Sequence, residues 1–175
     1  MKLDNALSLI RDIPDYPQPG ILFRDITPLL ADKTAFEVVT ESLLSFDRSA
    51  SHIAGIEARG FILASAMAIK GGAGFVPIRK AGKLPHAVFS QSYSLEYGSA
   101  TLEIHQDALV TSSKVLLVDD VLATGGTIMA ALELIQQAGG AISHLCVLLE
   151  ITALEGRARI SRECPDVQIH SLVQV

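Results

Sequence analysis

The fold of this chain is decided by the stretch Val115–Thr127, which reads VLLVDDVLATGGT. Its first part is a continuous apolar run, typical of a strand that is buried on both faces of a sheet. Two aspartates, Asp119 and Asp120, stand where that strand ends, and a loop of small residues leads from them to the start of a helix. A strand, a loop and a helix in this order predict one unit of a parallel α/β sheet.

The loop after the two aspartates has the residue types that a phosphate group needs. Gly125 and Gly126 let the backbone approach a ligand closely, and amides at a helix N-terminus point outward with the positive end of the helix dipole. Thr124 and Thr127 add hydroxyl donors. The aspartates just before the loop are placed to accept hydrogen bonds from sugar hydroxyls, so the segment favours a sugar phosphate over a nucleoside triphosphate.

Other interpretations of this loop can be weighed by reading the sequence. A Walker motif needs a lysine after its last glycine, whereas Gly126 is followed by Thr127, and no G-x-G-x-x-G pattern is present. A simpler alternative stays open, in which the aspartates cap the helix and the glycines make a tight turn. We favour a ligand site because two adjacent acids at the end of an apolar strand each need partners when buried. The loop alone does not identify the chemical step.

Composition narrows the class of protein. The chain has 175 residues, of which 49% are hydrophobic and 19% are charged, which suffices for one compact core. Its formal net charge is −5. Because binding to a nucleic-acid backbone needs a surplus of clustered Lys and Arg, we expect no nucleic-acid partner. Any nucleotide chemistry should therefore involve small molecules.

The sequence shows neither an export pattern nor a membrane-spanning pattern. The N-terminal segment lacks the long apolar core and cleavage site of a signal peptide. The most apolar stretch, Phe61–Ile69, is about half as long as the ~18 residues that cross a bilayer. Cys146 and Cys164 have neither metal-ligand spacing nor the pattern of a disulfide framework, so we expect two reduced, buried thiols. A cytoplasmic protein with no membrane partner is expected.

Strands and helices alternate along the rest of the chain. Thr34 and Glu37 have the spacing of a capping box that opens a helix, and the proline-rich segment Ile13–Gly20 is expected to be irregular. A loop with glycine, proline and charge is expected at 79–85 and a projecting hairpin at 93–105. The expected helices are 3–10, 34–44, 61–69 and 127–138, and the expected strands are 52–56, 75–78, 114–118 and 142–149. Apolar strands separated by helices predict a parallel sheet covered on both faces, with the ligand crevice at the strands' carboxyl ends.

Residues 118–127 resemble the phosphoribosyl-pyrophosphate motif of the type I phosphoribosyltransferases. Further segments spread over most of the chain are similar to the adenine-specific members of that family, and they occur in the same order. These segments are Pro19–Pro28, Gly55–Phe61, Arg79–Pro85 and Tyr93–Gly98. The resemblance implies the type I fold, with a central parallel sheet flanked by helices, a projecting hairpin with a flexible loop, and a small N-terminal hood. It places the hood at residues 1–33 and the core at 34–175 of one domain.

The resemblance also implies roles for residues on the sugar-phosphate side. Asp119 and Asp120 would hold the ribose hydroxyls, and the turn Glu57–Gly60 would bind the pyrophosphate through backbone amides in an unusual conformation. Arg59 would supply charge and take part in catalysis. Ala58 departs from the family pattern, in which a serine adds a hydroxyl donor. The 5-phosphate would be held by Ala123, Thr124, Gly125, Gly126 and Thr127.

On the base side and in the loop, the resemblance implies further roles. Apolar side chains of the segment Leu22, Phe23 and Arg24 would sandwich adenine. Glu96 would approach N7 of the base and handle its proton. The cations expected to close over the pyrophosphate are Arg79, Lys80 and Lys83, and Tyr97 is a further implied contact to phosphoribosyl pyrophosphate. Simpler alternatives stay open at each place: a core contact for Leu22 and Phe23, a solvated charge for Arg24, a surface arginine at Arg59, a solvated cluster in the loop and an outward-facing strand residue at Glu96.

The reaction implied by the resemblance belongs to purine salvage. A phosphoribosyl group would pass from phosphoribosyl pyrophosphate to adenine and give AMP and pyrophosphate. Mg²⁺ is the implied cofactor, bound mainly through the substrate, since no carboxylate cluster with dedicated spacing is visible. A homodimer is also implied. Two alternatives remain at this point: a 6-oxopurine such as hypoxanthine, guanine or xanthine as the acceptor, and a regulator that has lost catalysis.

Overall fold

The computed structural model describes residues 1–94 and 98–175. The chain forms two compact units, Met1–Ser42 and Leu43–Val175. The division expected from the sequence, a hood of 1–33 and a core of 34–175, stays a prediction.

The first unit begins with a short helix, α1 (Leu3–Leu7), followed by an antiparallel pair of strands. The strands are β1 (Arg11–Pro14) and β2 (Leu22–Asp25). The expectation of an irregular segment from Ile13 was therefore wrong at its start. Prolines did not prevent pairing because Pro14 is the last residue of β1 and the other two prolines lie in the turn, where a missing N–H breaks no strand hydrogen bond.

Two helices complete the N-terminal part, α2 (Thr27–Ala31) and α3 (Lys33–Leu44), the second running into the next unit. The expected capping box at Thr34 was wrong, because Thr34 is already the second residue of α3. Asp32 takes the capping role: its carboxylate accepts a hydrogen bond of 2.8 Å from the backbone N–H of Ala35. The helix expected over 34–44 is confirmed within one residue.

The second unit is built on a sheet that has seven strands within the described residues, in the order β5-β6-β4-β3-β7-β8-β9. Pairing is parallel from β4 through β9 and antiparallel along β5-β6-β4, so the expected, mainly parallel sheet is confirmed. The strands are β3 (His52–Ile56), β4 (Gly74–Lys80), β5 (Val88–Ser94), β6 (Ser99–His105), β7 (Ser113–Leu122), β8 (Gly140–Glu150) and β9 (Gln168–Gln174).

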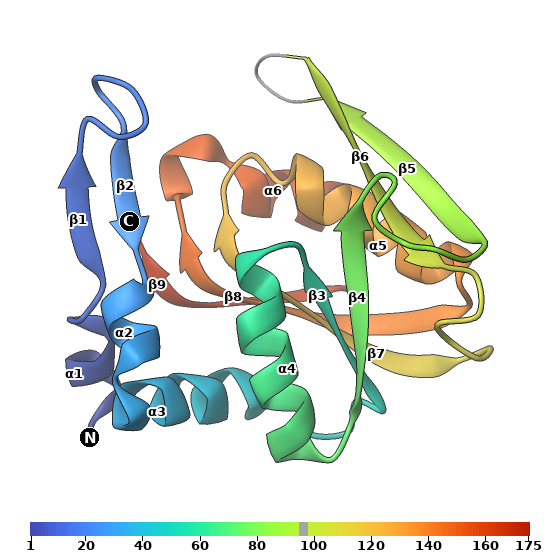
Figure 1. The fold of residues 1–175 in the computed structure, drawn as a ribbon, viewed down its shortest axis with the longest axis horizontal. Coiled ribbons are helices and arrows are strands. Elements are labelled where there is room, and N and C mark those ends of the chain that lie inside the picture. The colour runs from blue at the N-terminus through green and yellow to red at the C-terminus, as the bar shows by residue number, and fades with distance from the viewer. Residues whose placement is uncertain (95–97) are drawn as a thin grey trace. The chain divides into compact units, whose positions relative to one another are not determined.

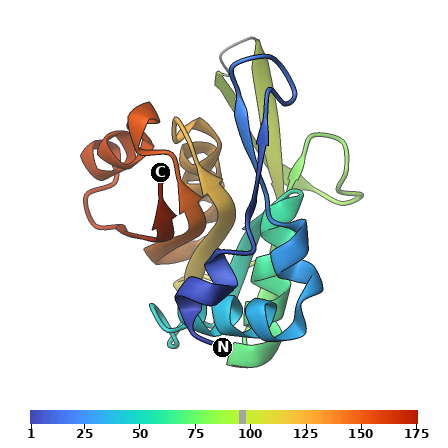
Figure 2. The same cartoon turned by 90° about the vertical axis from the view of Figure 1, so that its left-hand side faces the viewer.

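Helices cover both faces of this sheet. Helix α4 (Arg59–Gly71) lies on one face, and α5 (Gly126–Gln137) and α6 (Gly156–Glu163) lie on the other (Figure 1; Figure 2). A short 3-10 helix, η1 (Thr152–Leu154), precedes α6. The inward face expected for α5 is confirmed, because Ile128, Ala131, Leu132 and Ile135 are all buried. Each parallel crossover thus returns the chain so that the loops after β3, β4 and β7 share one edge.

The hairpin expected over 93–105 is present but longer. It starts at Val88 and joins the parallel strands only through β6, where Arg79 pairs with Glu103 and Lys80 with Leu102. Arg79 and Lys80 were expected in a loop, yet both belong to β4, because pairing with β6 extends that strand past its apolar part. The polar face of β5 and β6 weakens the apolar signal from which the strands were predicted.

Both cysteines carry free thiols, and only one is fully buried. The Cys146 thiol donates to the backbone carbonyl of Leu43 at 3.7 Å, and burial raises its pKa to about 12. Cys164 is partly exposed, so the expectation of two buried thiols holds for one of them. In the described part of the chain, every helix is too short or too polar to cross a membrane.

Candidate active site

The stretch Val115–Thr127 forms most of β7, the short loop after it and the start of α5. Asp119 and Asp120 are still within the strand, which continues to Leu122. Gly125 has a φ of +81° and stands immediately before the helix, a backbone conformation that a side chain would strain. The loop encloses a hollow of about 70 Å³, lined by Asp119, Val121 and residues 123–128. A small recess therefore lies at the helix N-terminus where the sequence predicts a phosphate site, and binding of a phosphate there stays a prediction.

Burial disfavours the negative charge of the two aspartates. Asp120 is only 6% exposed, and its backbone N–H donates to Asp119 Oδ1 at 2.9 Å. Burial, together with the neighbouring charge of Asp120, raises the pKa of Asp119 well above its usual range. Burial also raises the pKa of Asp120, an effect that the charge of Arg59 opposes. A binding partner that donates hydrogen bonds to these carboxylates would offset this effect of burial.

The turn from β3 to α4 lies directly beside the aspartates. Arg59 is the first residue of α4, and its Nε lies 2.8 Å from Asp120 Oδ2. That distance makes an ion pair, although no donor in the described residues meets the geometry of a hydrogen bond to this oxygen. A methyl group at Gly60 would lie 2.8 Å from Asp119 Oδ1. The Glu57–Ala58 peptide is cis. Binding of pyrophosphate by this turn stays a prediction.

Glu57 organises the next strand, a role that sequence reasoning missed. Its carboxylate accepts hydrogen bonds of 3.2 Å from both Nε and Nη2 of Arg79 and of 3.1 Å from the backbone N–H of Lys80. The hydrogen bonds from Arg79 lower the pKa of Glu57. Arg79 also donates to the backbone carbonyl of Lys83 at 3.0 Å. Arg79 is therefore paired with Glu57, although its side chain is still 32% exposed. The signal available in the sequence was an acid at Glu57, directly after one strand, and a base at Arg79, near the end of the next strand.

The remaining predicted residues lie in other parts of the chain. Leu22, Phe23 and Arg24 are on β2 of the first unit, where Leu22 is 46% exposed. The Phe23 ring contacts the Tyr16 ring edge-on at 5.2 Å between centroids, and Arg24 forms an ion pair with Asp12. Because the Asp12 side chain is 51% exposed, this pair lies at the surface, and the role of Arg24 stays a prediction. Glu96 and Tyr97 lie outside the described residues.

The end of β5 lies beside the start of α5, next to the loop of residues 123–127. A methyl group at Gly126 would lie 3.4 Å from the carbonyl oxygen of Ser94 and 3.6 Å from the ring of Tyr93. The loops after β3 and β7, the end of β4 and the end of β5 therefore meet at one place. Within residues 1–94 and 98–175, no three His, Cys, Asp or Glu side chains gather as metal ligands.

Comparison with known proteins agrees with this geometry. Residues 29–173 match the model of the phosphoribosyl transferase domain. A curated relative, the adenine phosphoribosyltransferase of Streptomyces clavuligerus, is 55% identical over 156 residues, which cover 88% of each chain. The chain belongs to the adenine phosphoribosyltransferase family.

Solved structures of this family share the whole fold. The adenine phosphoribosyltransferase of Thermoanaerobacter pseudethanolicus is 43% identical, with a TM-score of 0.93 over 99% of this chain and 100% of that chain. The enzyme from Giardia lamblia, solved with 9-deazaadenine, is 39% identical, with a TM-score of 0.92 over 100% of this chain and 98% of that chain. The type I phosphoribosyltransferase fold expected from the sequence is thereby confirmed.

Proposed function

We propose that this protein transfers the phosphoribosyl group of phosphoribosyl pyrophosphate to adenine, giving AMP and pyrophosphate in purine salvage. The observation that carries the proposal is the adjacent pair of the half-buried Asp119 and the buried Asp120 at a small recess that Asp119 helps to line, with Arg59 paired to Asp120. This is a site for a sugar phosphate that carries a second anionic group. The choice of adenine follows the adenine phosphoribosyltransferases that share most of the chain.

The sugar phosphate would lie along the end of β7. The 5-phosphate would accept hydrogen bonds from the amides of 123–127 and from the hydroxyls of Thr124 and Thr127. Asp119 and Asp120 would accept hydrogen bonds from the ribose hydroxyls. Their negative charge would also stabilise the positive charge that develops on the ribose as its bond to pyrophosphate breaks. Adenine N9 would then form the new bond to the anomeric carbon.

The leaving group would lie between the turn after β3 and the end of β4. Backbone amides at Ala58 and the guanidinium of Arg59 would bind it, and no hydroxyl is needed at residue 58. Arg79, Lys80, Lys83 and Tyr97 would contribute contacts to the phosphoribosyl pyrophosphate. Mg²⁺ would be bound mainly through oxygens of the substrate and would neutralise charge on the departing pyrophosphate.

The base would be bound by the segment Leu22, Phe23 and Arg24. An exposed leucine beside a phenylalanine offers apolar surface to a purine ring, while the ion pair of Arg24 with Asp12 stiffens the strand. Glu96 would act as the acid or base at N7. We further propose that the protein is cytoplasmic and works as a homodimer, as its family resemblance implies.

The assay that tests this proposal measures product formation from five bases, namely adenine, hypoxanthine, guanine, xanthine and uracil, each with phosphoribosyl pyrophosphate and Mg²⁺. We expect saturable AMP formation from adenine, and loss of turnover when the metal is chelated. If the protein turned over only 6-oxopurines, the acceptor would be a 6-oxopurine and not adenine. Tight binding of phosphoribosyl pyrophosphate without any product would instead indicate a regulator that has lost catalysis.

Replacing Glu96 separates base chemistry from sugar-phosphate binding. We expect Glu96→Gln to lower kcat by about 10²–10⁴, the usual contribution of a general acid or base. Affinity for phosphoribosyl pyrophosphate should change little, because the carboxylate would act at the base. Stopped-flow turnover and calorimetric titration of the same preparations measure the two effects. Glu37→Gln, at an exposed position of α3, is the matched control; unchanged turnover in Glu96→Gln would remove Glu96 from the mechanism.

A further inference from the structure

We propose that Gly156, held in place by the ion pair of Arg157 with Glu150, is a positioning residue for the loop that binds the 5-phosphate. The inference rests on the proposed function of that loop. Gly156, Arg157 and Glu150 lie outside residues 118–127 and outside the four other segments whose resemblance to the family is described above. All three come from the end of β8 and the start of α6, more than twenty residues further along the chain.

The first observation is the direct contact of two backbones. Gly156 is buried, and a methyl group added there would overlap the carbonyl oxygen of Ala123. It would also lie 2.8 Å from Leu122 Cδ1 and 3.0 Å from the backbone N of Gly125. In the opposite direction, a methyl group at Gly125 would meet the Gly156 carbonyl at 3.2 Å. The start of α6 therefore supports the loop from behind, and only glycine leaves room for this contact.

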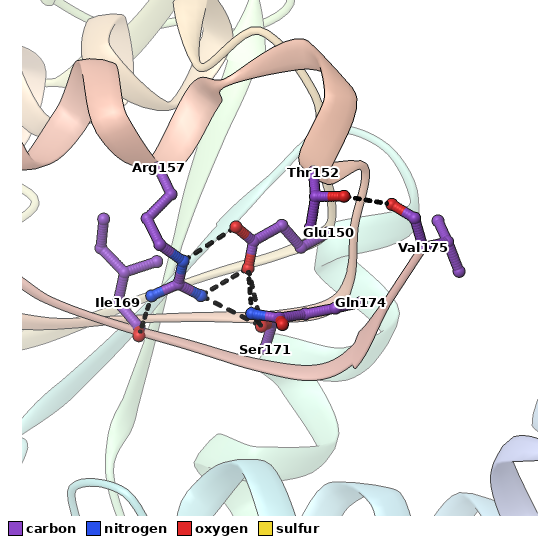
Figure 3. Close-up of polar contacts among 7 residues, drawn as sticks. All are labelled: Glu150, Thr152, Arg157, Ile169, Ser171, Gln174 and Val175. Atoms are coloured by element: carbon purple, nitrogen blue, oxygen red, sulfur yellow. Dashed lines mark hydrogen bonds and ion pairs between the residues drawn. The ribbon is translucent and has the colours of Figure 1, made fainter.

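The second observation is a hydrogen-bonded network that fixes the start of α6. Figure 3 shows the Arg157 guanidinium between the carboxylate of Glu150 and the backbone of β9. Its Nε donates to Glu150 Oε1 at 2.8 Å, its Nη1 to the carbonyl of Ile169 at 2.7 Å and its Nη2 to Ser171 Oγ at 3.1 Å. Ser171 and Gln174 in turn donate to Glu150 Oε2 at 2.8 and 3.2 Å. The residue after Gly156 is thus held on three sides.

The third observation joins this network to β7. Glu150 is only 4% exposed and pairs in register with Leu122, the last residue of β7. The backbone N–H of Ile151 donates to the Leu122 carbonyl at 2.9 Å. The loop begins immediately after Leu122. Glu150 and Ile151 therefore fix the residue from which the loop starts, and Gly156 contacts the backbone of the loop itself. A loop constrained in this way presents its amides to a phosphate without first having to be ordered.

The consequence concerns binding more than the chemical step. The 5-phosphate does not react, so its contacts are the same in the ground state and in the transition state. Weakening such contacts raises KM and changes kcat little. A core substitution that merely destabilises the protein changes neither constant, provided that the folded fraction stays high.

The experiment compares Gly156→Ala with Gly140→Ala. Both add one methyl group at a crowded glycine, but at Gly140 the neighbours are the core side chains Ile135, Leu109 and Val115. We expect Gly156→Ala to raise the KM for phosphoribosyl pyrophosphate about tenfold or more with kcat within about threefold, and Gly140→Ala to leave KM within about twofold. Calorimetric titration with ribose 5-phosphate should show the same loss of affinity in Gly156→Ala only.

The possible outcomes test the positioning role of Gly156 and the proposed function separately. An unchanged KM in Gly156→Ala, or equal rises in both variants, overturns the positioning role. If Gly156→Ala does not fold, Arg157→Lys takes its place: it keeps a charge facing Glu150 but loses the fork that reaches Ile169 and Ser171, and a KM below twice that of the wild type overturns the role. If the wild type turns over no purine, the proposed function fails, whereas the ribose 5-phosphate titration still tests the loop.

Discussion

Asp119→Asn is expected to lower kcat/KM for phosphoribosyl pyrophosphate by about 10²–10³, the usual cost of removing an electrostatic stabiliser of the transition state. The same substitution is expected to make the ligand-free protein more stable at pH 7. Both effects come from one cause. Burial disfavours the negative charge of Asp119, and the proposed reaction uses that charge to stabilise the ribose. Activity and thermal stability should therefore change in opposite directions.

The pH dependence of this stability gain follows from the pKa shift. Burial raises the pKa of Asp119 above its value of ~3.9 in the unfolded chain, so the folded state holds the proton to higher pH than the unfolded state. Stability consequently falls as the pH rises through and above that unfolded value. An asparagine does not titrate, so Asp119→Asn should exceed the wild type in Tm at pH 7, and the difference should shrink towards pH 4.

Thermal unfolding from pH 4 to pH 8, with activity assays on the same samples, measures both effects. Each kcal/mol corresponds to about 2–4 °C in a domain of this size. Asp107→Asn is the matched control, because it makes the same chemical change at an exposed position. A lower Tm than wild type at pH 7 would show that the carboxylate is well paired without ligand. An unchanged kcat/KM would remove Asp119 from the ribose site.

Arg157→Met is expected to cause the largest loss of stability among these variants. Removing the guanidinium leaves Glu150 buried at 4% exposure, with hydrogen bonds only from Ser171 and Gln174 among the described contacts. Breaking a buried ion pair costs about 3–5 kcal/mol. We expect the lower end of that range, because the Arg157 side chain is 35% exposed and water screens part of the interaction.

Acid dependence and a second substitution identify the cause of this loss. Hydrogen bonds from Arg157 lower the pKa of Glu150 below its unfolded value of ~4.3, so the stabilisation is present above that pH and disappears as the pH falls through the folded value. Urea unfolding at a series of pH values from 7 downwards should show a large difference between variant and wild type at pH 7, and the difference should shrink as the pH falls below about 4. Adding Glu150→Gln should restore part of the loss. Equal losses at both pH values would point to lost packing.

The sequence predicted the site's central loop well because its signal is local. The run from Val115 to Thr127 contains the apolar strand, the acids, the glycines and the helix start within a single segment, and they occur in the expected order. The expected end of the strand at Val118 was wrong, because β7 continues through both aspartates to Leu122. The turn at Glu57–Gly60 was found in the same way. Short-range patterns of this kind depend on backbone geometry, which neighbouring residues determine.

Contacts between distant segments could not be predicted in this way. Nothing around Arg79 shows that its strand is lengthened by pairing with Glu103, or that Glu57 receives its guanidinium. The strands of the hairpin at Arg11–Asp25 were hidden by prolines that fall only at the strand end and in the turn. Gly156 gives no signal at all, because its importance lies in the nearness of Ala123 after folding.

The buried thiol of Cys146 has a consequence for the protein's response to oxidants. Peroxides and disulfides attack the thiolate, and with a pKa of about 12 the thiolate fraction at pH 7 is on the order of 10⁻⁵. Burial also raises the pKa of Cys164, which lowers its reactivity in the same direction. None of the groups assigned to the reaction is a cysteine. We therefore expect AMP synthesis by this chain to resist oxidants that inactivate enzymes with a reactive cysteine.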